Sequence, residues 1–291
     1  MKKIALCTGI NDYPGTANDL SGCINDAWDW RTFFKNLGFQ VYYSSDSQLT
    51  VRNFKQLLVD YISLLETGDW FVCQYSGHGT QWPDVNNDEL DGYDEALFLY
   101  DGPLIDDEIR DIIRVHAKEG VFILFILDSC FSGSATRKVN VLPGHLGKRK
   151  FIPPPVWNVK KVNNTAKKKR FLEEISLVDV LMSGCSDNES SYDAFINGRF
   201  NGAFTRNAID SYRAGMTFQQ WHAEISKRLP SSDYPQSPQL EGSVENLRKK
   251  FPDPMPSDVV PVVDYEGGSW IVPAVIIGLV VIGVVLYFVL R

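Results

Sequence analysis

Two short segments of this sequence carry residue types that together could do nucleophilic chemistry. Cys130 follows the apolar run 121–127, and His78 stands between two glycines just after the apolar run 70–75. A free thiol is mostly protonated at neutral pH, so a cysteine nucleophile needs a base such as imidazole beside it. Each residue alone has a structural alternative, since a lone cysteine is commonly a small core residue. A histidine and a cysteine that each follow a predicted strand together favour a catalytic role over these structural alternatives.

The elements that position these residues follow from the hydrophobic pattern. Short apolar runs closed by turn formers predict strands at 4–8, 41–43, 70–75, 121–127 and 177–182, with a hairpin strand at 96–100 and an edge strand at 237–240. Helical spacing and caps predict helices at 19–37, 50–65, 108–116, 202–214 and 218–229. This alternation predicts an α/β fold with a doubly wound, mostly parallel sheet.

In a parallel sheet, reactive groups are displayed just beyond the carboxyl ends of the strands. We therefore expect His78 and Cys130 to meet at one sheet edge. The backbone N–H groups of Gly79 and Cys130 would then be the donors that stabilise an oxyanion.

Composition narrows the classes of partner and compartment. The formal net charge of −7 gives no reason to expect nucleic-acid binding. The five cysteines are odd in number and lack CxxC spacing, which favours a reducing compartment and neither disulfides nor a zinc site. The charge is unevenly spread, because residues 129–172 hold no acidic residue and many lysines and arginines.

The C-terminal stretch Trp270–Leu290 is uncharged and apolar, and at ~1.5 Å per residue it would span the ~30 Å of a bilayer core. Trp270 and Tyr287 lie near its ends, where interfacial aromatics belong. The alternative is a buried helix of a soluble protein. We predict a single-pass C-terminal membrane anchor at 270–290 behind a proline-rich, acidic tether at 246–269. The N-terminus lacks a signal-peptide pattern, so the catalytic domain is expected in the cytoplasm, although Arg291 by the positive-inside rule argues for the opposite orientation.

The motifs YSGHG and DSCFSG, in this order and spacing, resemble the catalytic segments of metacaspases, the caspase-like cysteine peptidases of family C14. GINDYP, GCINDA, DGYDEALF, IDDEI, SGCSDNESSYDA and GAFT extend the resemblance over about residues 2–245. It implies a caspase–hemoglobinase fold, that is, a three-layer sandwich with a mostly parallel six-stranded sheet. It also implies an endopeptidase that cuts after Arg or Lys, with Cys130 as nucleophile and His78 as its partner.

The resemblance also divides the chain. Residues 1–245 would form the peptidase domain, with a large-subunit-like part (1–136), a basic linker (137–170) and a small-subunit-like part (171–245). The linker has three interpretations: a solvated insertion, a contact with anionic lipid headgroups, or a segment that the enzyme cuts itself. We predict self-cleavage within Arg137–Arg170.

The family's primary substrate pocket maps onto Cys23, Asp26, Ser76 and Asp128. Its two carboxylates suit a basic side chain, because guanidinium and carboxylate form charge-assisted hydrogen bonds. The alternatives are a solvated helix residue for Asp26 and a strand-end cap for Asp128.

The chemistry itself needs no cofactor, but many metacaspases need calcium. The matching ligands would be Asp94, Asp106 and Asp107, whose carboxylate oxygens suit Ca²⁺. A fourth acidic ligand of some relatives would fall near Arg137, which cannot ligate a cation. The alternative for these acids is a solvated loop and a helix cap.

A second function from another class is a catalytically silent caspase-fold module that binds partners at a membrane. The presence of both His78 and Cys130, together with the two pocket carboxylates, favours the peptidase.

Overall fold

The computed structural model describes residues 1–83, 93–131, 147–154, 178–186 and 189–253. Its centre is a six-stranded sheet in the order β12-β9-β7-β3-β1-β2. The parallel strands are β1 (Lys3–Gly9), β2 (Gln40–Ser45), β3 (Trp70–Ser76), β7 (Phe122–Asp128) and β9 (Val180–Ser183), and β12 (Gln239–Gly242) adds an antiparallel edge. The mostly parallel six-stranded sheet is as predicted.

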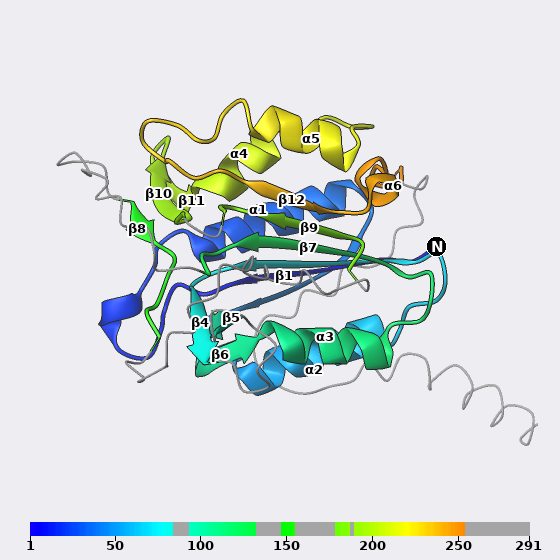
Figure 1. Cartoon of the computed structure of the whole chain (residues 1–291), viewed down its shortest axis with the longest axis horizontal. Helices are drawn as coiled ribbons and strands as arrows, with labels where there is room; N and C mark the ends of the chain where they lie inside the picture. The colour runs from blue at the N-terminus through cyan, green and yellow to red at the C-terminus, as the bar shows by residue number, and fades with distance from the viewer. Residues whose placement is uncertain (84–92, 132–146, 155–177, 187–188, 254–291) are drawn as a thin grey trace, which may run out of the picture.

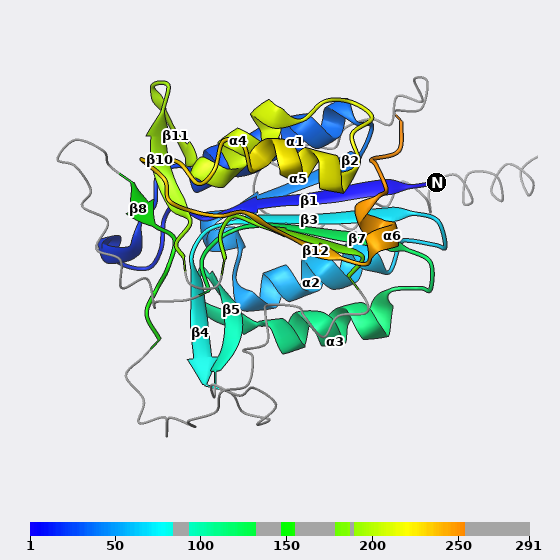
Figure 2. The same cartoon turned by 45° about the horizontal axis from the view of Figure 1, so that its top comes forward.

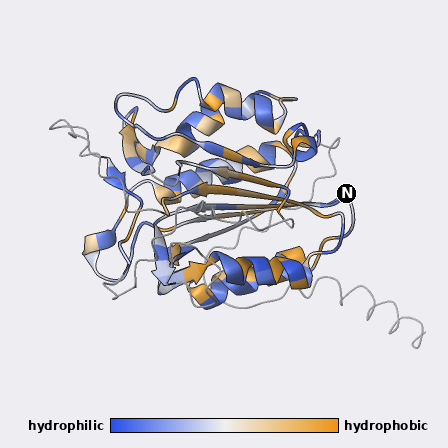
Figure 3. Ribbon diagram, in the orientation of Figure 1, coloured by the Kyte–Doolittle hydropathy of each residue, from blue (hydrophilic) through white to orange (hydrophobic). Residues whose placement is uncertain are grey.

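Strand β7 shows why the apolar run 121–127 has no polar alternation. Successive strand residues point to opposite faces. Phe122, Leu124 and Ile126 belong to one core cluster, and Ile123, Phe125 and Leu127 belong to the other. Both faces of the strand are therefore covered, and Figure 3 shows the hydrophobic colour concentrated in the central strands.

Helices cover both faces of the sheet, which makes three layers (Figures 1 and 2). One face carries α2 (Val51–Ile62) and α3 (Asp106–His116), and the other carries α1 (Cys23–Asn36), α4 (Ala203–Ser211) and α5 (Phe218–Ile225). The predicted helices are present. The helix predicted at 19–37 begins later, at Cys23, and those predicted at 50–65, 202–214 and 218–229 end earlier than their apolar pattern suggested.

Two small sheets flank the carboxyl ends of the parallel strands, at the left of Figure 1. One contains β4 (Gly79–Pro83), β5 (Tyr93–Leu99) and β6 (Gly102–Ile105), and the other contains β8 (Lys148–Arg149), β10 (Tyr192–Ile196) and β11 (Arg199–Gly202). Only the β5 part was predicted as a strand. The short helices are η1 (Thr16–Asn18), η2 (Asp46–Gln48) and α6 (Val244–Leu247).

The core continues into the first part of the predicted tether. Phe251 is buried, and its ring packs against those of Phe33 and Trp221 at centroid distances of 6.0 and 5.8 Å. Within the described part of the chain, no helix is long and apolar enough to cross a membrane. The predicted anchor at 270–290 lies outside the described residues.

Candidate active site

The sheet brings His78 and Cys130 to one edge. β3 and β7 are parallel neighbours in a register that places Ser76 opposite Asp128. His78 and Cys130 each follow two residues later, where the strands have ended. The juxtaposition expected from the sequence is therefore present.

His78 is held in a defined orientation and tautomer. Its backbone N–H donates to the Tyr13 hydroxyl at 2.9 Å, and its Nε2 lies 2.7 Å from the carbonyl oxygen of Asn18. A carbonyl can only accept a hydrogen bond, so Nε2 carries the proton and Nδ1 keeps its lone pair. Nδ1 is buried and has no hydrogen-bond partner in the described residues. In this tautomer Nδ1 is the ring nitrogen whose lone pair can accept a proton.

The pKa of His78 is lowered from 6.5 to about 4. Burial is the main cause, and the hydrogen bond to Asn18 offsets part of it. The positive charges of Lys148 and Lys150 lower this pKa further. The imidazole is thus neutral at physiological pH and able to accept a proton.

Cys130 is fully buried. The N–H of Ser191 donates to its Sγ at 2.6 Å, and the thiol lies 3.4 Å from the Ser191 carbonyl oxygen. Ser191 comes just before β10, so a segment distant in sequence fixes the position of the sulfur.

The two predicted oxyanion donors hold one carbonyl oxygen, that of Lys150. The N–H of Gly79 donates to it at 3.0 Å and the N–H of Cys130 at 3.1 Å. A side chain at position 79 would not fit, because a Cβ there would lie 2.0 Å from the Cys130 carbonyl oxygen. The Lys150 carbonyl therefore lies where a scissile carbonyl would be polarised.

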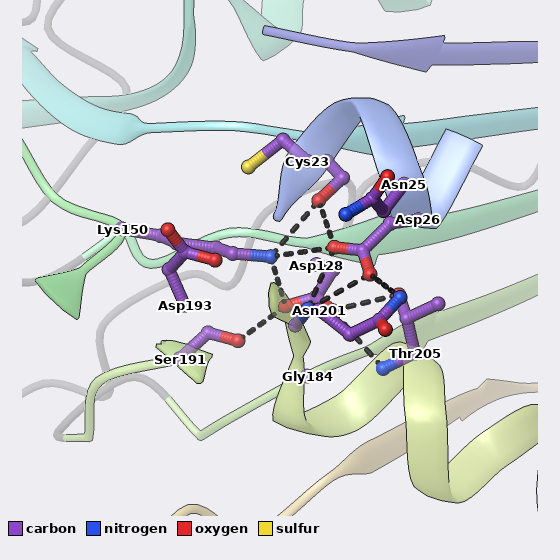
Figure 4. Close-up of polar contacts among 12 residues, drawn as sticks. Cys23, Asn25, Asp26, Asp128, Lys150, Gly184, Ser191, Asp193, Asn201 and Thr205 are labelled. Atoms are coloured by element: carbon purple, nitrogen blue, oxygen red, sulfur yellow. Dashed lines mark hydrogen bonds and ion pairs between the residues drawn. The ribbon is translucent and has the colours of Figure 1, made fainter. Parts of the chain in front are cut away.

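The Lys150 side chain is buried in what we call the acidic site, formed by Cys23, Asp26, Ser76 and Asp128. Figure 4 shows Cys23, Asp26 and Asp128 around this side chain. Its Nζ lies 3.1 Å from Asp26 Oδ2, 3.0 Å from Asp128 Oδ1 and 2.9 Å from Ser76 Oγ. Burial alone would lower the pKa of Lys150, but the charges of Asp128, Asp26 and Asp193, with the Cys23 thiol nearby, outweigh it and raise that pKa well above its ordinary value. All four residues predicted for the primary pocket thus surround one ammonium group.

The start of α4 fixes both carboxylates. The N–H of Gly202 donates to both oxygens of Asp26 at 2.8 and 2.9 Å. Asp128 Oδ2 accepts from the N–H of Thr205 at 3.0 Å and from its hydroxyl at 2.7 Å. Free N–H groups and positive partial charge gather at a helix N-terminus, so this is a favourable place for two acids.

The main chain around Lys150 lies across the site in an extended form. β8 pairs antiparallel with β10, and the N–H of Lys150 donates to the Ser191 carbonyl at 3.0 Å. On the other side of Lys150, the N–H of Ile152 donates to the Gly79 carbonyl at 3.0 Å. Residues 148–152 therefore form an extended segment between β10 and the start of β4.

Lys150 and Ser191 were not singled out from the sequence, and neither were Asp193, Asn201 and Thr205. The available signal for Lys150 was its place in a basic linker of a chain expected to cut after basic residues. Many other lysines and arginines of that linker carry the same signal. Only the structure distinguishes this one.

The residues predicted as calcium ligands lie on two neighbouring elements, and the calcium prediction stays a prediction. Asp94 lies on β5, while Asp106 and Asp107 begin α3, where Asp107 forms an ion pair with Arg110. The described residues contain no group of three or more His, Cys, Asp or Glu side chains that could hold a metal ion. Arg137 lies outside the described residues.

Comparison with known proteins shows the family of this chain. The family model described as "Caspase domain" matches residues 2–252. Metacaspase-1 of Schizosaccharomyces pombe is 30% identical, over 83% of this chain and 67% of that protein. Metacaspase-1 of Emericella nidulans is 32% identical, over 83% and 70%. The chain therefore spans about two thirds of the length of these relatives.

A solved structure shares the fold. Protein GSU0716 from Geobacter sulfurreducens superposes with a TM-score of 0.65 at 28% identity, covering 86% of this chain and 98% of that one. The family match and the two fungal relatives show that this chain belongs to the caspase domain family and is a metacaspase-like cysteine peptidase.

Proposed function

We propose that the chain is an endopeptidase that cuts on the carboxyl side of lysine and arginine, and that its first substrate is its own Lys150–Phe151 bond. One observation carries this proposal. The Lys150 carbonyl lies on the N–H groups of Gly79 and Cys130, while its ammonium group lies between Asp26 and Asp128. Backbone and side chain together match the requirements of a substrate residue.

The reaction follows from these positions. His78 Nδ1 accepts the thiol proton, and Cys130 Sγ attacks the Lys150 carbonyl carbon, whose oxygen becomes an anion stabilised by the two N–H donors. His78 then gives the proton to the departing Phe151 nitrogen as the C–N bond breaks. Water, deprotonated by His78, hydrolyses the resulting thioester and restores the thiol.

The self-cut would open the site for other substrates. Cys130 is fully buried, and residues 148–152 lie across the edge of β10 where an incoming peptide would bind. Adding an extended peptide to a free strand edge is a common mode of recognition, in which backbone hydrogen bonds give affinity and side-chain pockets give specificity. Lys148 Nζ also lies 3.1 Å from the Ala17 carbonyl oxygen, which suits a second basic residue two positions before the cut.

Peptide turnover tests the proposal. We expect short fluorogenic peptides ending in Arg or Lys to be cleaved, a peptide ending in Asp to be resistant, and Cys130→Ala to abolish all turnover. Preference for Asp would contradict the role of the acidic site. A chain that stays uncut and cleaves no peptide would contradict the enzyme and favour the silent interaction module.

Calcium and membrane attachment extend this proposal. If Asp94, Asp106 and Asp107 bind Ca²⁺ during activation, EGTA will stop the self-cut and added calcium will restore it. If residues 270–290 anchor the chain, the full-length protein will stay with the membrane pellet in sodium carbonate, whereas a chain ending at residue 253 will not. Protease protection of the catalytic domain in intact cells would place that domain in the cytoplasm.

A further inference from the structure

Asp193 lies close to the acidic site without binding the Lys150 ammonium group. It belongs to β10, is 2% exposed, and interacts electrostatically with Lys150, Asp26 and Asp128. Its Oδ2 accepts the N–H of Ser21 at 2.6 Å. Its Oδ1 is buried and has no hydrogen-bond partner in the described part of the chain.

A buried carboxylate oxygen without a donor costs free energy, so an arrangement that keeps one needs an explanation. Burial raises the pKa of Asp193 to about 6, against the opposing effect of Lys150, so the group is ionised at neutral pH. The fold also leaves space for the Asp193 carboxylate, because residue 22 is a glycine. A Cβ at Gly22 would lie 2.4 Å from Asp193 Oδ1.

The number of donors on the bound side chain explains why Oδ1 is unpaired. An ammonium group has three N–H donors, and the Lys150 ammonium already has three acceptors in Asp26, Asp128 and Ser76. A guanidinium group has five donors in a planar fork. Arginine in the same site would therefore have two donors in excess of those three acceptors.

The position of Asp193 suits these extra donors. Figure 4 shows its carboxylate beside the Lys150 side chain. Arginine carries Nε one bond closer to the main chain than the Nζ of lysine, and its terminal nitrogens spread sideways. A lysine side chain presents only methylene groups along the part that an arginine Nε–H would occupy.

We propose that Asp193 is a specificity-determining residue that selects arginine over lysine at the substrate position that Lys150 occupies in the uncut chain. This inference rests on the proposed function, because it assigns a role at the same site. It also makes Lys150 the less favoured of the two basic residues, so the cut end would be displaced readily by an arginyl substrate.

The first measurement uses the self-processed, full-length wild-type chain and two coumarin peptides, acetyl-Gly-Lys-Arg-Arg and acetyl-Gly-Lys-Arg-Lys, which differ only in the last residue. We expect kcat/KM to be higher for the arginyl peptide by about tenfold or more, as hydrogen bonds to a charged group imply. Equal rates for the two peptides would overturn the inference without any variant.

The second measurement uses Asp193→Asn. The Ser21 N–H needs an acceptor, so the amide oxygen will face Ser21 and the amide NH₂ will face the site, where it opposes a guanidinium group. We expect the arginine-to-lysine ratio to fall to about one, because the arginyl peptide loses more than the lysyl peptide, which loses only the electrostatic interaction between Asp193 and the ammonium group.

Asp179→Asn is the matched control, because Asp179 also accepts a backbone N–H, that of Ile123 at 2.8 Å, and Ile123 lies at the opposite end of β7. It should leave the ratio unchanged. An equal loss for both peptides in Asp193→Asn would overturn this inference while the proposed peptidase stands. Cleavage of neither peptide by the wild-type chain would overturn both.

Discussion

Asp26 and Asp128 share the Lys150 ammonium group. The two carboxylates stabilise the buried ammonium group, and the ammonium group in turn stabilises the two buried carboxylates. Burial raises the pKa of Asp26, while the charge of Lys150 opposes this rise. Two buried carboxylates without a cation would repel each other. If Lys150 leaves after the proposed self-cut, the acidic site will need another basic side chain, as the proposed pocket for lysine or arginine requires.

His78 gives a prediction on pH dependence. Its pKa is lowered from 6.5 to about 4 in the folded chain, so between these values the unfolded chain binds a proton that the folded chain does not. The stability that neutral His78 contributes is present above pH 6.5 and is lost as the pH falls toward 4. In a Cys130→Ala background, which keeps the chain uncut, stability should rise between pH 4.5 and 6.5 by about 1 kcal/mol per pH unit more than in Cys130→Ala/His78→Asn.

Urea unfolding of this pair at pH 4.5, 5.5 and 6.5 measures the difference. All other titrating groups, including Asp193, are common to both variants, so their contributions cancel to first order. Parallel stability curves for the two variants would show that His78 titrates normally in the folded chain.

Among the elements, α4 does most to shape the acidic site, because its first turn binds Asp128 and the residue before it binds Asp26. Gly202 must be glycine there, since a Cβ would lie 2.0 Å from Asp128 Oδ2. The Thr205 hydroxyl donates to Asp128 at 2.7 Å and accepts from Trp30 Nε1 at 3.2 Å. One side chain thus joins the acidic site to the core.

Thr205→Val should therefore weaken both substrate binding at the acidic site and the stability of the core around Trp30. Without the hydroxyl, Asp128 loses a donor and the Trp30 N–H loses its acceptor, so we expect kcat/KM for arginyl peptides to fall about tenfold and stability to fall by about 1–3 kcal/mol. Thr205→Ser keeps the hydroxyl and should retain activity within about threefold. Equal kcat/KM for Thr205→Val and wild type would mean that the helix backbone alone fixes Asp128.

The large elements were predictable because each has a strong local pattern. The run 121–127 is apolar throughout and forms a strand buried on both faces, and the helix at 51–62 has a cap at Thr50 that accepts the Asn53 N–H at 3.2 Å. β8 could not be predicted, because its two residues form a strand only by pairing with β10. Lys150 is likewise defined by tertiary contacts alone. Nothing local distinguishes it from its basic neighbours.

At the scale of the molecule, an aromatic cluster ties the C-terminal part of the described chain to the core. Phe251 is 3% exposed and packs against α1 and α5, and the N–H of Phe218 donates to the Lys249 carbonyl at 3.0 Å. The prolines and acidic residues of the segment 246–269 led us to predict a tether there, although its first residues belong to the folded core. The contribution of Phe251 depends on partners that are distant in sequence.

Phe251→Ala should lower the free energy of unfolding by about 3–5 kcal/mol, as expected for a buried aromatic residue. Phe195→Ala is the control, since Phe195 is 52% exposed and its loss should cost about 0.5 kcal/mol or less. Urea denaturation in the Cys130→Ala background measures both. A loss below about 1 kcal/mol for Phe251→Ala would mean that the core closes without residue 251.

The intact mass and new N-terminal sequence of the purified chain test the central claim most directly. We expect wild type to yield two fragments, 1–150 and 151–291, the second beginning at Phe151, and Cys130→Ala to remain one chain. Lys150→Gln should slow this cut strongly, whereas Lys160→Gln, in the same linker, should process like wild type. A wild-type chain that stays intact while it cleaves arginyl peptides, or one cut at another bond regardless of Lys150, would contradict the account.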